Sequence, residues 1–384
     1  MRIVGLDLGV RHIAYCEVKD GKVIDRCSVR SLSQLESRLG PERPPAQVAF
    51  EACREGWHVH DKLLAWGHTP CMLDTTRIRQ IGVGQHKRKN DAIDAETIAF
   101  ALESGRIPAA HVLSPERRAL RAKLSVRGAL VETRAQYVTT IRGLSRAAGV
   151  LLPTCSTDAF AVKFEAASQQ LDAVTRALVA PLIAVLKVLE LELARVDQEL
   201  ATLAQRDPII GLCATVPGVG LIVASTFVSV IDEAKRFHNA HAVGAYLGLV
   251  PGEATTGGPG KRRLGGITKQ GNTMARVMLV QAAWLILRAR DTNDPLRRWA
   301  DNLVQKRGKR IAVIALARKL AGVLWAMWRD GTVYDRAANA TASAGGVRRD
   351  ARQQAHRADA LEVAAKKFQR AAAAAHKISE ATGM

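Results

Sequence analysis

The sequence predicts an α/β domain at the N-terminus followed by a mostly helical remainder, and three observations lead to this. The first hundred residues alternate short apolar runs with amphipathic stretches, as strands mixed with helices do. After Ser114, apolar residues recur every three or four positions, which indicates long helices. The chain of 384 residues is 48% hydrophobic and 24% charged, so it can bury substantial cores.

The N-terminal elements follow from these runs in order. Residues 1–8 and 12–18 are short apolar segments, and Asp20-Gly21 is a strong hairpin signal between a second and a third strand. We then expect a helix over 31–39, a strand over 47–51, a helix over 57–66, a strand over 70–74 and a helix opening near Asp91. Three antiparallel strands followed by helix, strand, helix, strand and helix is the order of an RNase H-like α/β domain, which we assign to residues 1–110.

The remaining chain divides into three further predicted parts. Ser114-Pro115-Glu116 is a typical helix start, and two apolar stripes separated by a proline-containing break predict a long antiparallel helical hairpin or coiled coil over 114–206. Its role is either that of a spacer or that of a dimerisation element. A mostly helical domain over 207–330 follows. We interpret residues 334–384 as a basic Ala/Arg-rich tail, frayed or disordered, that makes only non-specific phosphate contacts.

The charge balance indicates the class of partner. Lys and Arg number 56 against 36 acidic residues, a formal net charge of +20, which favours polyanions and nucleic acid first. No apolar run reaches the roughly 18 residues of a membrane span, and the N-terminus lacks a signal-peptide layout, so we expect a cytoplasmic protein without a membrane partner. The six cysteines show no Cys-x-x-Cys spacing and indicate neither a zinc site nor a disulfide framework.

Four acids stand where an RNase H-like sheet would bring them together. Asp7 interrupts the apolar first strand, Glu51 ends the fourth, and Asp91 and Asp94 open the helix that should cross them. Each acid alone could serve the structure, as a strand end or a helix cap. Four converging carboxylates repel, however, and Mg²⁺ with its preference for hard oxygen ligands would relieve the conflict. The cluster therefore predicts magnesium-assisted phosphoryl transfer, with Lys87, Arg88 and Lys89 as phosphate-binding residues on its approach.

These segments resemble a known family. GLDLG, FEAC-x-x-GWHVH and KNDAIDAETIA are similar to the D, E and D-x-x-D elements of DEDD transposases of the IS110 type, in particular the IS1111-like branch with its pilin-gene DNA invertase. Through the fold there is a more distant likeness to RuvC-type Holliday-junction resolvases. The resemblance implies a RuvC-like N-terminal domain with Asp7, Glu51, Asp91 and Asp94 as catalytic metal ligands.

A second group of residues lies in the C-terminal part. Pro217-Gly218-Val219-Gly220 has a helix-hairpin-helix pattern in which Gly218 and Gly220 let backbone N–H groups approach a phosphate, although a plain helix turn fits equally. Further along, hydroxyls and glycines stand among cations, an arrangement suited to a nucleophile that attacks phosphate, or to a basic surface loop. The cations that we assign to nucleic-acid binding are Lys261, Arg262, Arg263, Lys269 and Arg276.

This block resembles the C-terminal transposase domain of the same family through YLGLVP and GGITK-x-GN. Family members carry a serine before the first glycine of a T-G-G-like position, and that serine forms a covalent link to DNA. The matching residue here is Thr256, beside Thr255. Threonine keeps the hydroxyl but adds a methyl group that restricts its rotamers. We therefore predict Thr256 as the nucleophile and Thr255 as the fallback.

The leading hypothesis is an insertion-sequence transposase, a DNA recombinase that cuts and rejoins strands through a covalent hydroxyl–DNA intermediate. The resemblance implies Mg²⁺, donor and target DNA, a structured bridge RNA as guide, and a homodimer or homotetramer. One alternative is a RuvC-like metal-dependent nuclease in which the threonines are inert. Another is a decayed copy that binds nucleic acid without cutting it. An actin-like ATPase is indicated only by GLDLG, without a second phosphate loop.

Overall fold

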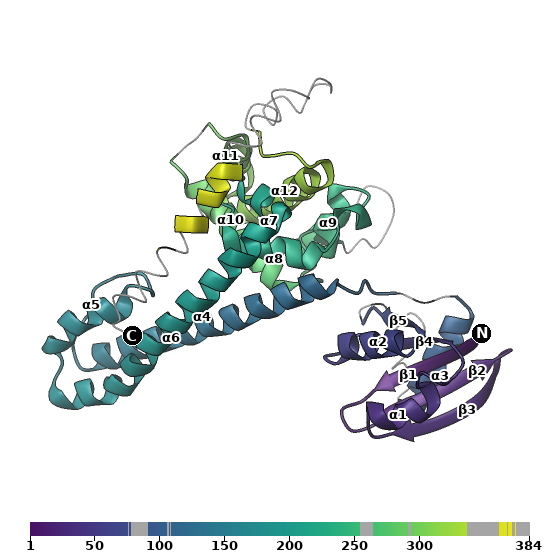
Figure 1. The fold of residues 1–384 in the computed structure, drawn as a ribbon. Coiled ribbons are helices and arrows are strands. Elements are labelled where there is room, and N and C mark those ends of the chain that lie inside the picture. The colour runs from purple at the N-terminus through teal and green to yellow at the C-terminus, as the bar shows by residue number, and fades with distance from the viewer. Residues whose placement is uncertain are drawn as a thin grey trace. The chain divides into compact units, whose positions relative to one another are not determined.

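A computed structural model describes residues 1–75, 77, 91–105, 107, 109–253, 264–290, 293–335, 361–366, 368–370 and 373 (Figure 1). Contacts within the chain divide it into two compact units, Met1–Leu113 and Ser114–Met384. The first unit is built on a sheet with helices on both faces. The second unit is almost entirely helical.

The first unit contains a five-stranded mixed sheet. Its strands are β1 (Arg2–Leu8), β2 (Ile13–Lys19), β3 (Lys22–Val29), β4 (Ala46–Glu51) and β5 (Thr69–Leu73). The spatial order is β3-β2-β1-β4-β5, in which β1, β2 and β3 are antiparallel while β4 and β5 run parallel to β1. The predicted mixed α/β domain is confirmed, and so is the expected contact between the first and fourth strands.

The hairpin between β2 and β3 forms where the sequence predicts it. Asp20 and Gly21 have φ of 53° and 72°, and a two-residue turn with positive φ at both positions matches the twist of the flanking strands. Asp tolerates this conformation because its short polar side chain can bond locally, and Gly tolerates it because it has no Cβ.

Helices cover both faces of this sheet. On one face, α1 (Leu32–Leu39) and α2 (Gly56–Ala65) bury their apolar sides against the sheet, in a cluster that includes Leu6 and Phe50. The side chain of Ser31 caps α1 by accepting a hydrogen bond from the Gln34 N–H. On the other face, α3 (Asp91–Glu103) crosses the central strands.

The close approach of α3 to β1 depends on Gly5. A Cβ at this position would lie 2.1 Å from the carbonyl oxygen of Ala95 and 2.6 Å from the amide nitrogen of Ala99. Only a residue without a side chain therefore allows the helix backbone to lie directly on the strand. This contact fixes the height of α3 above the sheet, and with it the position of the acids in its first turn.

The second unit begins with two long antiparallel helices, α4 (Pro115–Ala147) and α6 (Ala173–Arg206), joined through α5 (Phe160–Ala167) and the short η2 (Ser168–Gln170). Ion pairs keep an antiparallel register between the N-terminal part of α4 and the C-terminal half of α6: Lys123 with Glu199, Arg127 with Asp197, Arg134 with Glu190, and Arg117 with Asp207, the residue after α6. The predicted helical hairpin is confirmed, while a coiled-coil supercoil stays a prediction.

A helical core completes the second unit (Figure 1). It consists of α7 (Pro208–Ala214), α8 (Leu221–Ile231), η3 (Ala234–Arg236), α9 (Ala240–Tyr246), α10 (Thr273–Arg288), α11 (Pro295–Arg307) and α12 (Lys309–Asp330). A small antiparallel hairpin of β6 (Pro251–Glu253) and β7 (Leu264–Ile267) interrupts the helices. The core is one continuous apolar cluster.

Within the described part of the chain, α12 is the one helix that is long and apolar enough to cross a membrane. More than half of its most apolar stretch, 56%, is buried inside the protein. Leu316, Leu320 and Leu324 recur on the buried side and are fully enclosed by the other helices. Its apolar composition is therefore explained by its place at the centre of the helical core.

Part of the C-terminal tail belongs to this core. Residues 361–366 and 368–370 are helical, and Ala364 and Phe368 are buried in the apolar cluster of the second unit. The expectation that the tail makes only phosphate contacts is wrong for this segment. Its apolar residues are too few to show a periodic stripe among the many alanines, so the sequence alone did not indicate the packing.

Candidate functional site

Asp7 and Glu51 occupy equivalent places near the carboxyl ends of two neighbouring strands. β1 and β4 are parallel, and Leu6 pairs with Phe50 in their register. Asp7 and Glu51 are the next residues of the two strands, and both are partly buried. Their carboxylates therefore lie side by side at the carboxyl ends of these two strands.

Both acids project on the face of the sheet that α3 covers. Side chains alternate between the two faces of a strand. Gly5 of β1 lies against the α3 backbone at Ala95, and Ala49 of β4 belongs to an apolar cluster with α3 residues. Asp7 and Glu51 stand two positions after Gly5 and Ala49, so their side chains point to the same face.

The first turn of α3 brings two further acids to this face. Asp94 is 9% exposed and lies on the buried side of α3. Asp91 is exposed, and its Oδ2 lies 3.9 Å from the point that a Cβ on Gly9 would occupy. Asp91 thus borders the turn after β1. The structure places Asp7, Glu51 and Asp94 between sheet and helix, with Asp91 at the rim.

The four acids carry hard carboxylate oxygens, the type of ligand that Mg²⁺ prefers. Among the described residues, no group of three or more His, Cys, Asp or Glu side chains is arranged to hold a metal ion. A closed cage of protein ligands is therefore not present in this part of the chain. Hard carboxylate oxygens nevertheless fit Mg²⁺, which typically takes one or two carboxylates and completes its shell with phosphate oxygens and water.

Two basic residues beside the acids were missed by the sequence reasoning. Arg11 and His12 are exposed in the turn between β1 and β2, which also contains Gly9 and Val10. The Asp91 carboxylate borders this same turn at Gly9. The signal available in the sequence was G-V-R-H following the apolar strand, a basic turn where an uncharged one would suffice.

The β6–β7 hairpin carries the second predicted site. Thr255, Thr256, Lys261, Arg262 and Arg263 lie in the sequence between these strands and fall outside the described residues, as do Lys87, Arg88 and Lys89 before α3. The strands themselves pair with Pro251 opposite Ile267 and Glu253 opposite Leu264. The segment that contains the threonines therefore starts and ends at adjacent points of one hairpin.

At the base of this hairpin, two glycines allow the chain segments before and after it to pass each other in close contact. Gly248, with φ of 68°, lies so close to Gln270 that a Cβ would stand 2.2 Å from its carbonyl oxygen. Gly271, with φ of 129°, lies equally close to the carbonyl oxygen of Tyr246. Glycine is required at both positions, because any side chain would collide with the backbone of the segment that leaves or enters the hairpin.

Lys269 and Arg276 differ in their surroundings. Lys269 is exposed and adopts φ of 57°, with its N–H donating to the carbonyl of Gly248. The Arg276 guanidinium donates to the carbonyl oxygens of Leu247 and Gly271 at 3.3 and 2.9 Å. Arg276 thus ties the two sides of the hairpin base together, while Lys269 extends into solvent beside it.

The two glycines of the Pro217–Gly220 turn also differ. Gly218, with φ of 81°, faces α10, where a Cβ would lie 2.8 Å from a side-chain carbon of Ile286. Helix packing therefore explains this glycine. Gly220 is exposed, has open space around it and forms the N-terminal boundary of α8 without a side-chain cap. Of the pair, Gly220 is the one that a phosphate can approach.

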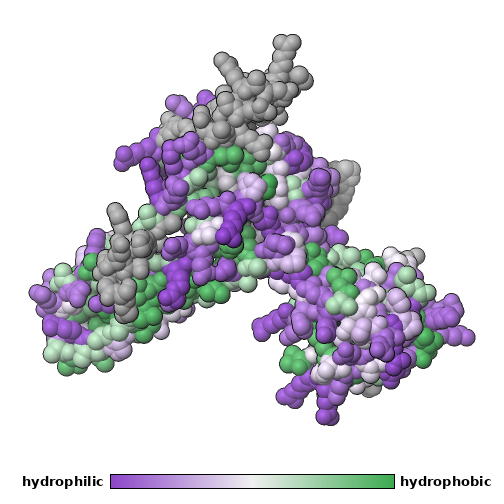
Figure 2. All heavy atoms as spheres, in the orientation of Figure 1, coloured by the Kyte–Doolittle hydropathy of each residue, from purple (hydrophilic) through white to green (hydrophobic). Residues whose placement is uncertain are grey.

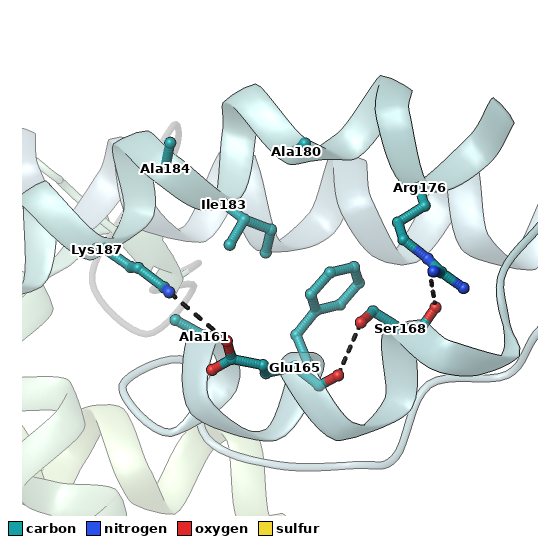
Figure 3. Close-up of a pocket in the computed structure, with 9 residues that line it drawn as sticks. Ala161, Glu165, Ser168, Arg176, Ala180, Ile183, Ala184 and Lys187 are labelled. Carbon is teal, nitrogen blue, oxygen red and sulfur yellow. Dashed lines mark hydrogen bonds and ion pairs between the residues drawn. The ribbon is translucent and has the colours of Figure 1, made fainter. Parts of the chain in front are cut away.

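A groove of about 320 Å³ lies between α5 and α6 in the helical hairpin (Figure 3). The charged side chains at its rim already have partners within the protein. Arg176 donates to the carbonyls of Ser168, Gln169 and Leu171. Lys187 forms an ion pair with Glu165 at 4.0 Å. Its floor is apolar, with Phe164 and Ile183. The groove thus presents no arrangement suited to catalysis.

Acids at the ends of adjacent strands in an α/β domain, joined to a basic helical region, define a class of enzyme that acts on a polyanion. Two family models make this specific. The DEDD transposase model of the IS110 type matches residues 4–146, and the model described as the transposase IS116/IS110/IS902 family matches residues 211–297. Together with the relatives described next, they show that the chain belongs to the IS116/IS110/IS902 family of transposases.

Similar curated proteins include a probable family 20 transposase from Pseudomonas aeruginosa, 30% identical over 76% of this chain and 86% of the relative. The transposase for insertion sequence element IS1328 from Yersinia enterocolitica is 27% identical over 87% of this chain and 98% of its own length. The transposase for IS1111A from Coxiella burnetii is 27% identical over 85% and 89%. The similarity thus extends over most of each protein.

Proposed function

We propose that this transposase cuts and rejoins DNA strands through a covalent threonine–DNA intermediate, with Mg²⁺ bound at the N-terminal acids and a bridge RNA as guide. The observation that carries the proposal is the placement of Asp7 and Glu51 side by side beneath α3, with Asp91 and Asp94 in its first turn. The strand order β3-β2-β1-β4-β5 supports an RNase H-like fold of the RuvC-like type for this unit.

The acids form the metal site in this proposal. Asp7, Glu51, Asp91 and Asp94 are the residues that would hold Mg²⁺, one or two of them by direct contact and the others through water molecules in its shell. When bound, Mg²⁺ neutralises charge that develops on the phosphate oxygens as a strand is cut. Arg11 and His12, exposed beside the acids, hold the DNA backbone against the site.

Thr256 supplies the nucleophile. Its Oγ releases its proton and forms a bond to phosphorus as the bond from phosphorus to one ribose oxygen breaks, and the released ribose oxygen takes up a proton, so that no net proton is gained or lost. Rejoining reverses the exchange with the hydroxyl of a different strand, which frees Thr256. Lys261, Arg262, Arg263 and Lys269 would stabilise the phosphate during both steps. Gly248 and Gly271 support this assignment because they hold the chain segments before and after the β6–β7 hairpin close together.

Donor and target DNA and the bridge RNA are the proposed partners, and the active form is a dimer or tetramer. The net charge of +20 supports binding of two nucleic acids. Gly220 at the start of α8 and the cations near the β6–β7 hairpin supply phosphate contacts. Base pairing with the RNA, rather than protein side chains, selects the DNA sequence.

The decisive experiment incubates the purified full chain with Mg²⁺, donor and target DNA and the non-coding RNA transcribed beside its gene. We expect a DNA adduct on Thr256, detected by mass spectrometry, and its loss in Thr256→Ala. Thr256→Ser is the matched control, since it retains the hydroxyl and should retain the adduct. Asp7→Asn should reduce cleavage at least about a hundredfold.

Other outcomes separate the alternatives. Hydrolysed ends without any protein-linked DNA, together with full activity of Thr256→Ala, identify a RuvC-like nuclease and overturn the covalent mechanism. Nucleic-acid binding without any Mg²⁺-dependent cleavage identifies a decayed copy. Target choice that does not follow compensatory changes in the RNA removes the guide from the proposal.

A further inference from the structure

The turn between α11 and α12 carries a dense group of exposed cations that the proposed function does not use. Gly308 alone separates the two helices and is the boundary residue of both. Two cations precede it and two follow it, and all four are exposed; we call them the basic corner: Lys306, Arg307, Lys309 and Arg310. Figure 2 shows hydrophilic side chains over much of the visible face of the helical core to which both helices belong.

The acids nearest to the basic corner in sequence are occupied elsewhere. No Asp or Glu stands between Asp301 and Asp330. Asp301 forms an ion pair with Arg297 and Asp330 forms one with Arg329, both at 2.8 Å. In the part of the chain that the structure describes, no side chain of the basic corner forms an ion pair or a hydrogen bond. The four positive charges therefore face solvent together and are available to an anion from outside the chain.

Helix stability explains only half of the basic corner. Lys306 and Arg307 lie in the last turn of α11, where the negative end of the helix dipole favours cations. Lys309 and Arg310 open α12, where the positive end of the dipole disfavours them, and the first turn of α12 contains no acid. The N–H groups of this turn also lack partners within the helix. These two cations therefore lower the stability of α12 unless an anion binds beside them.

The basic corner is held on a rigid support. Gly308 has φ of 78° and ψ of 162°, a conformation that is essentially restricted to glycine. Ala300 of α11 and Ala312 of α12 are fully buried in the helical core. The Lys319 ammonium of α12 lies 5.1 Å from the centre of the Trp299 ring of α11. The cations therefore extend from a fixed turn between two packed helices (Figure 1), which lowers the entropy that binding would cost.

We propose that the basic corner binds the phosphate backbone of double-stranded DNA independently of base sequence. Arg and Lys bind phosphate oxygens, and four cations around one turn suit a polymer with closely spaced phosphates. Structured RNA is the less suitable partner, because its recognition uses stacking rings and contacts to 2′-hydroxyls. The corner contains no aromatic or hydroxyl side chain, and the ring of Trp299, the nearest aromatic residue in sequence, already contacts Lys319.

The proposal rests on the DNA substrate of the proposed function but on none of its strand-cutting steps. The first test therefore measures the affinity of the full chain for a DNA duplex of arbitrary sequence, without Mg²⁺, over a range of salt concentrations. In Lys306→Gln/Arg307→Gln/Lys309→Gln/Arg310→Gln, the dissociation constant should rise at least about tenfold at low salt. The slope of the logarithm of affinity against the logarithm of salt concentration should become shallower by about 2–4.

The matched control removes the same charge from four other exposed cations by substitution with Gln: Lys19, Lys22, Lys163 and Arg206. Its slope should change by less than about 1. Equal effects of the two quadruple variants would show that net charge alone governs binding, which overturns the proposal.

Two other polyanions complete this test. Both quadruple variants are titrated with the non-coding RNA transcribed beside the gene and with vesicles of anionic lipid. A loss of affinity that is larger for the RNA than for DNA overturns the assignment to DNA, and so does a loss of vesicle binding while DNA binding stays intact. Corner-dependent DNA binding by a parent chain that forms no threonine adduct supports the proposal and refutes only the covalent mechanism.

The second test separates DNA binding from a role in folding. Lys309→Glu/Arg310→Glu places acids at the positive end of the α12 dipole, so the midpoint of thermal unfolding of the second unit should rise by about 1–4 °C. The affinity for DNA should nevertheless fall at least about tenfold, because two cations become two anions. A lower midpoint would show that the two cations serve the fold, and unchanged affinity would show that they do not contact DNA. Either result overturns the proposal.

Discussion

The Ser114 hydroxyl donates a 2.7 Å hydrogen bond to Oδ1 of Asp232, 118 residues further along the chain. Asp232 is buried and ends α8 with φ of 64°, a conformation that few residues other than glycine adopt. Ser114 precedes the first residue of α4. One side-chain contact therefore fastens the start of the long helical hairpin to the end of a core helix.

This contact predicts a graded response to substitution at position 232. Asp232→Ala removes the acceptor and places alanine at positive φ, which should lower the free energy of unfolding of the second unit by about 2–4 kcal/mol. Asp232→Asn retains an acceptor and tolerates the backbone, so its loss should be roughly half as large or less. Denaturant unfolding followed by circular dichroism measures both. Equal losses would show that the hydrogen bond and the backbone conformation are not the cause.

Gly5 should tolerate no side chain. Gly5→Ala places a Cβ against the α3 backbone, which should destabilise the first unit by about 1–3 kcal/mol and displace Asp94 from the sheet. DNA cleavage should fall with it. Gly128→Ala is the control, because Gly128 lies within α4 with nothing near its missing Cβ, and alanine there should stabilise by about 0.5–1 kcal/mol. Thermal unfolding and a cleavage assay provide the two readouts.

Removing one partner of the buried ion pair between Arg134 and Glu190 should lower the free energy of unfolding strongly. Replacing both partners with apolar residues should lower it much less. Its atoms approach to 3.1 Å with side chains 15 and 9% exposed, and burial raises the pKa of Glu190 above its ordinary value. Glu190→Ala removes the ion-pair partner of the buried Arg134 guanidinium and should cost about 3–5 kcal/mol. Arg134→Leu/Glu190→Leu should recover most of this loss. A double variant as unstable as the single one would contradict the desolvation argument.

Glu17 predicts acid sensitivity of the first unit. Hydrogen bonds from Arg2 hold the pKa of Glu17 below its ordinary value of 4.5, and Tyr15 also donates to this carboxylate. A carboxyl whose pKa is lower in the folded state stabilises the fold above its unfolded pKa, and the stabilisation is lost as pH falls through the folded value. Glu17→Gln should cost about 1.5–3 kcal/mol at neutral pH and show a weaker loss on acidification.

Amide hydrogen exchange in β1 and β2 is the measurement for Glu17, because it reports this unit separately from the helical one. In the parent chain, the protection of these amides should decrease once the pH is lower than about 4.5. The difference in protection between the parent and Glu17→Gln should become smaller over the same pH range. A constant difference across this range would show that Glu17 does not titrate with unfolding.

Local patterns were sufficient for much of the fold. The Asp20-Gly21 hairpin and the opening of α4 at Pro115 both lie where the sequence predicts them, although the Ser114 hydroxyl bonds to Asp232 and does not cap the helix. These features depend on residues close in sequence, whose conformational preferences act before any tertiary contact forms. Asp7 and Glu51 are site candidates from the sequence for a related reason, because a carboxylate in an apolar strand loses hydration unless a cation or a hydrogen-bond donor compensates it.

Contacts between distant segments decided the rest. Only the packed structure separates Asp94, turned toward the sheet, from Asp91 at the rim, since both belong to the same helical turn. Only packing assigns Gly218 to helix contact and leaves Gly220 open, although the two are one motif in sequence. It likewise buries Phe368 of the tail. Burial depends on which surfaces meet across the chain, and a linear pattern of residues does not contain that information.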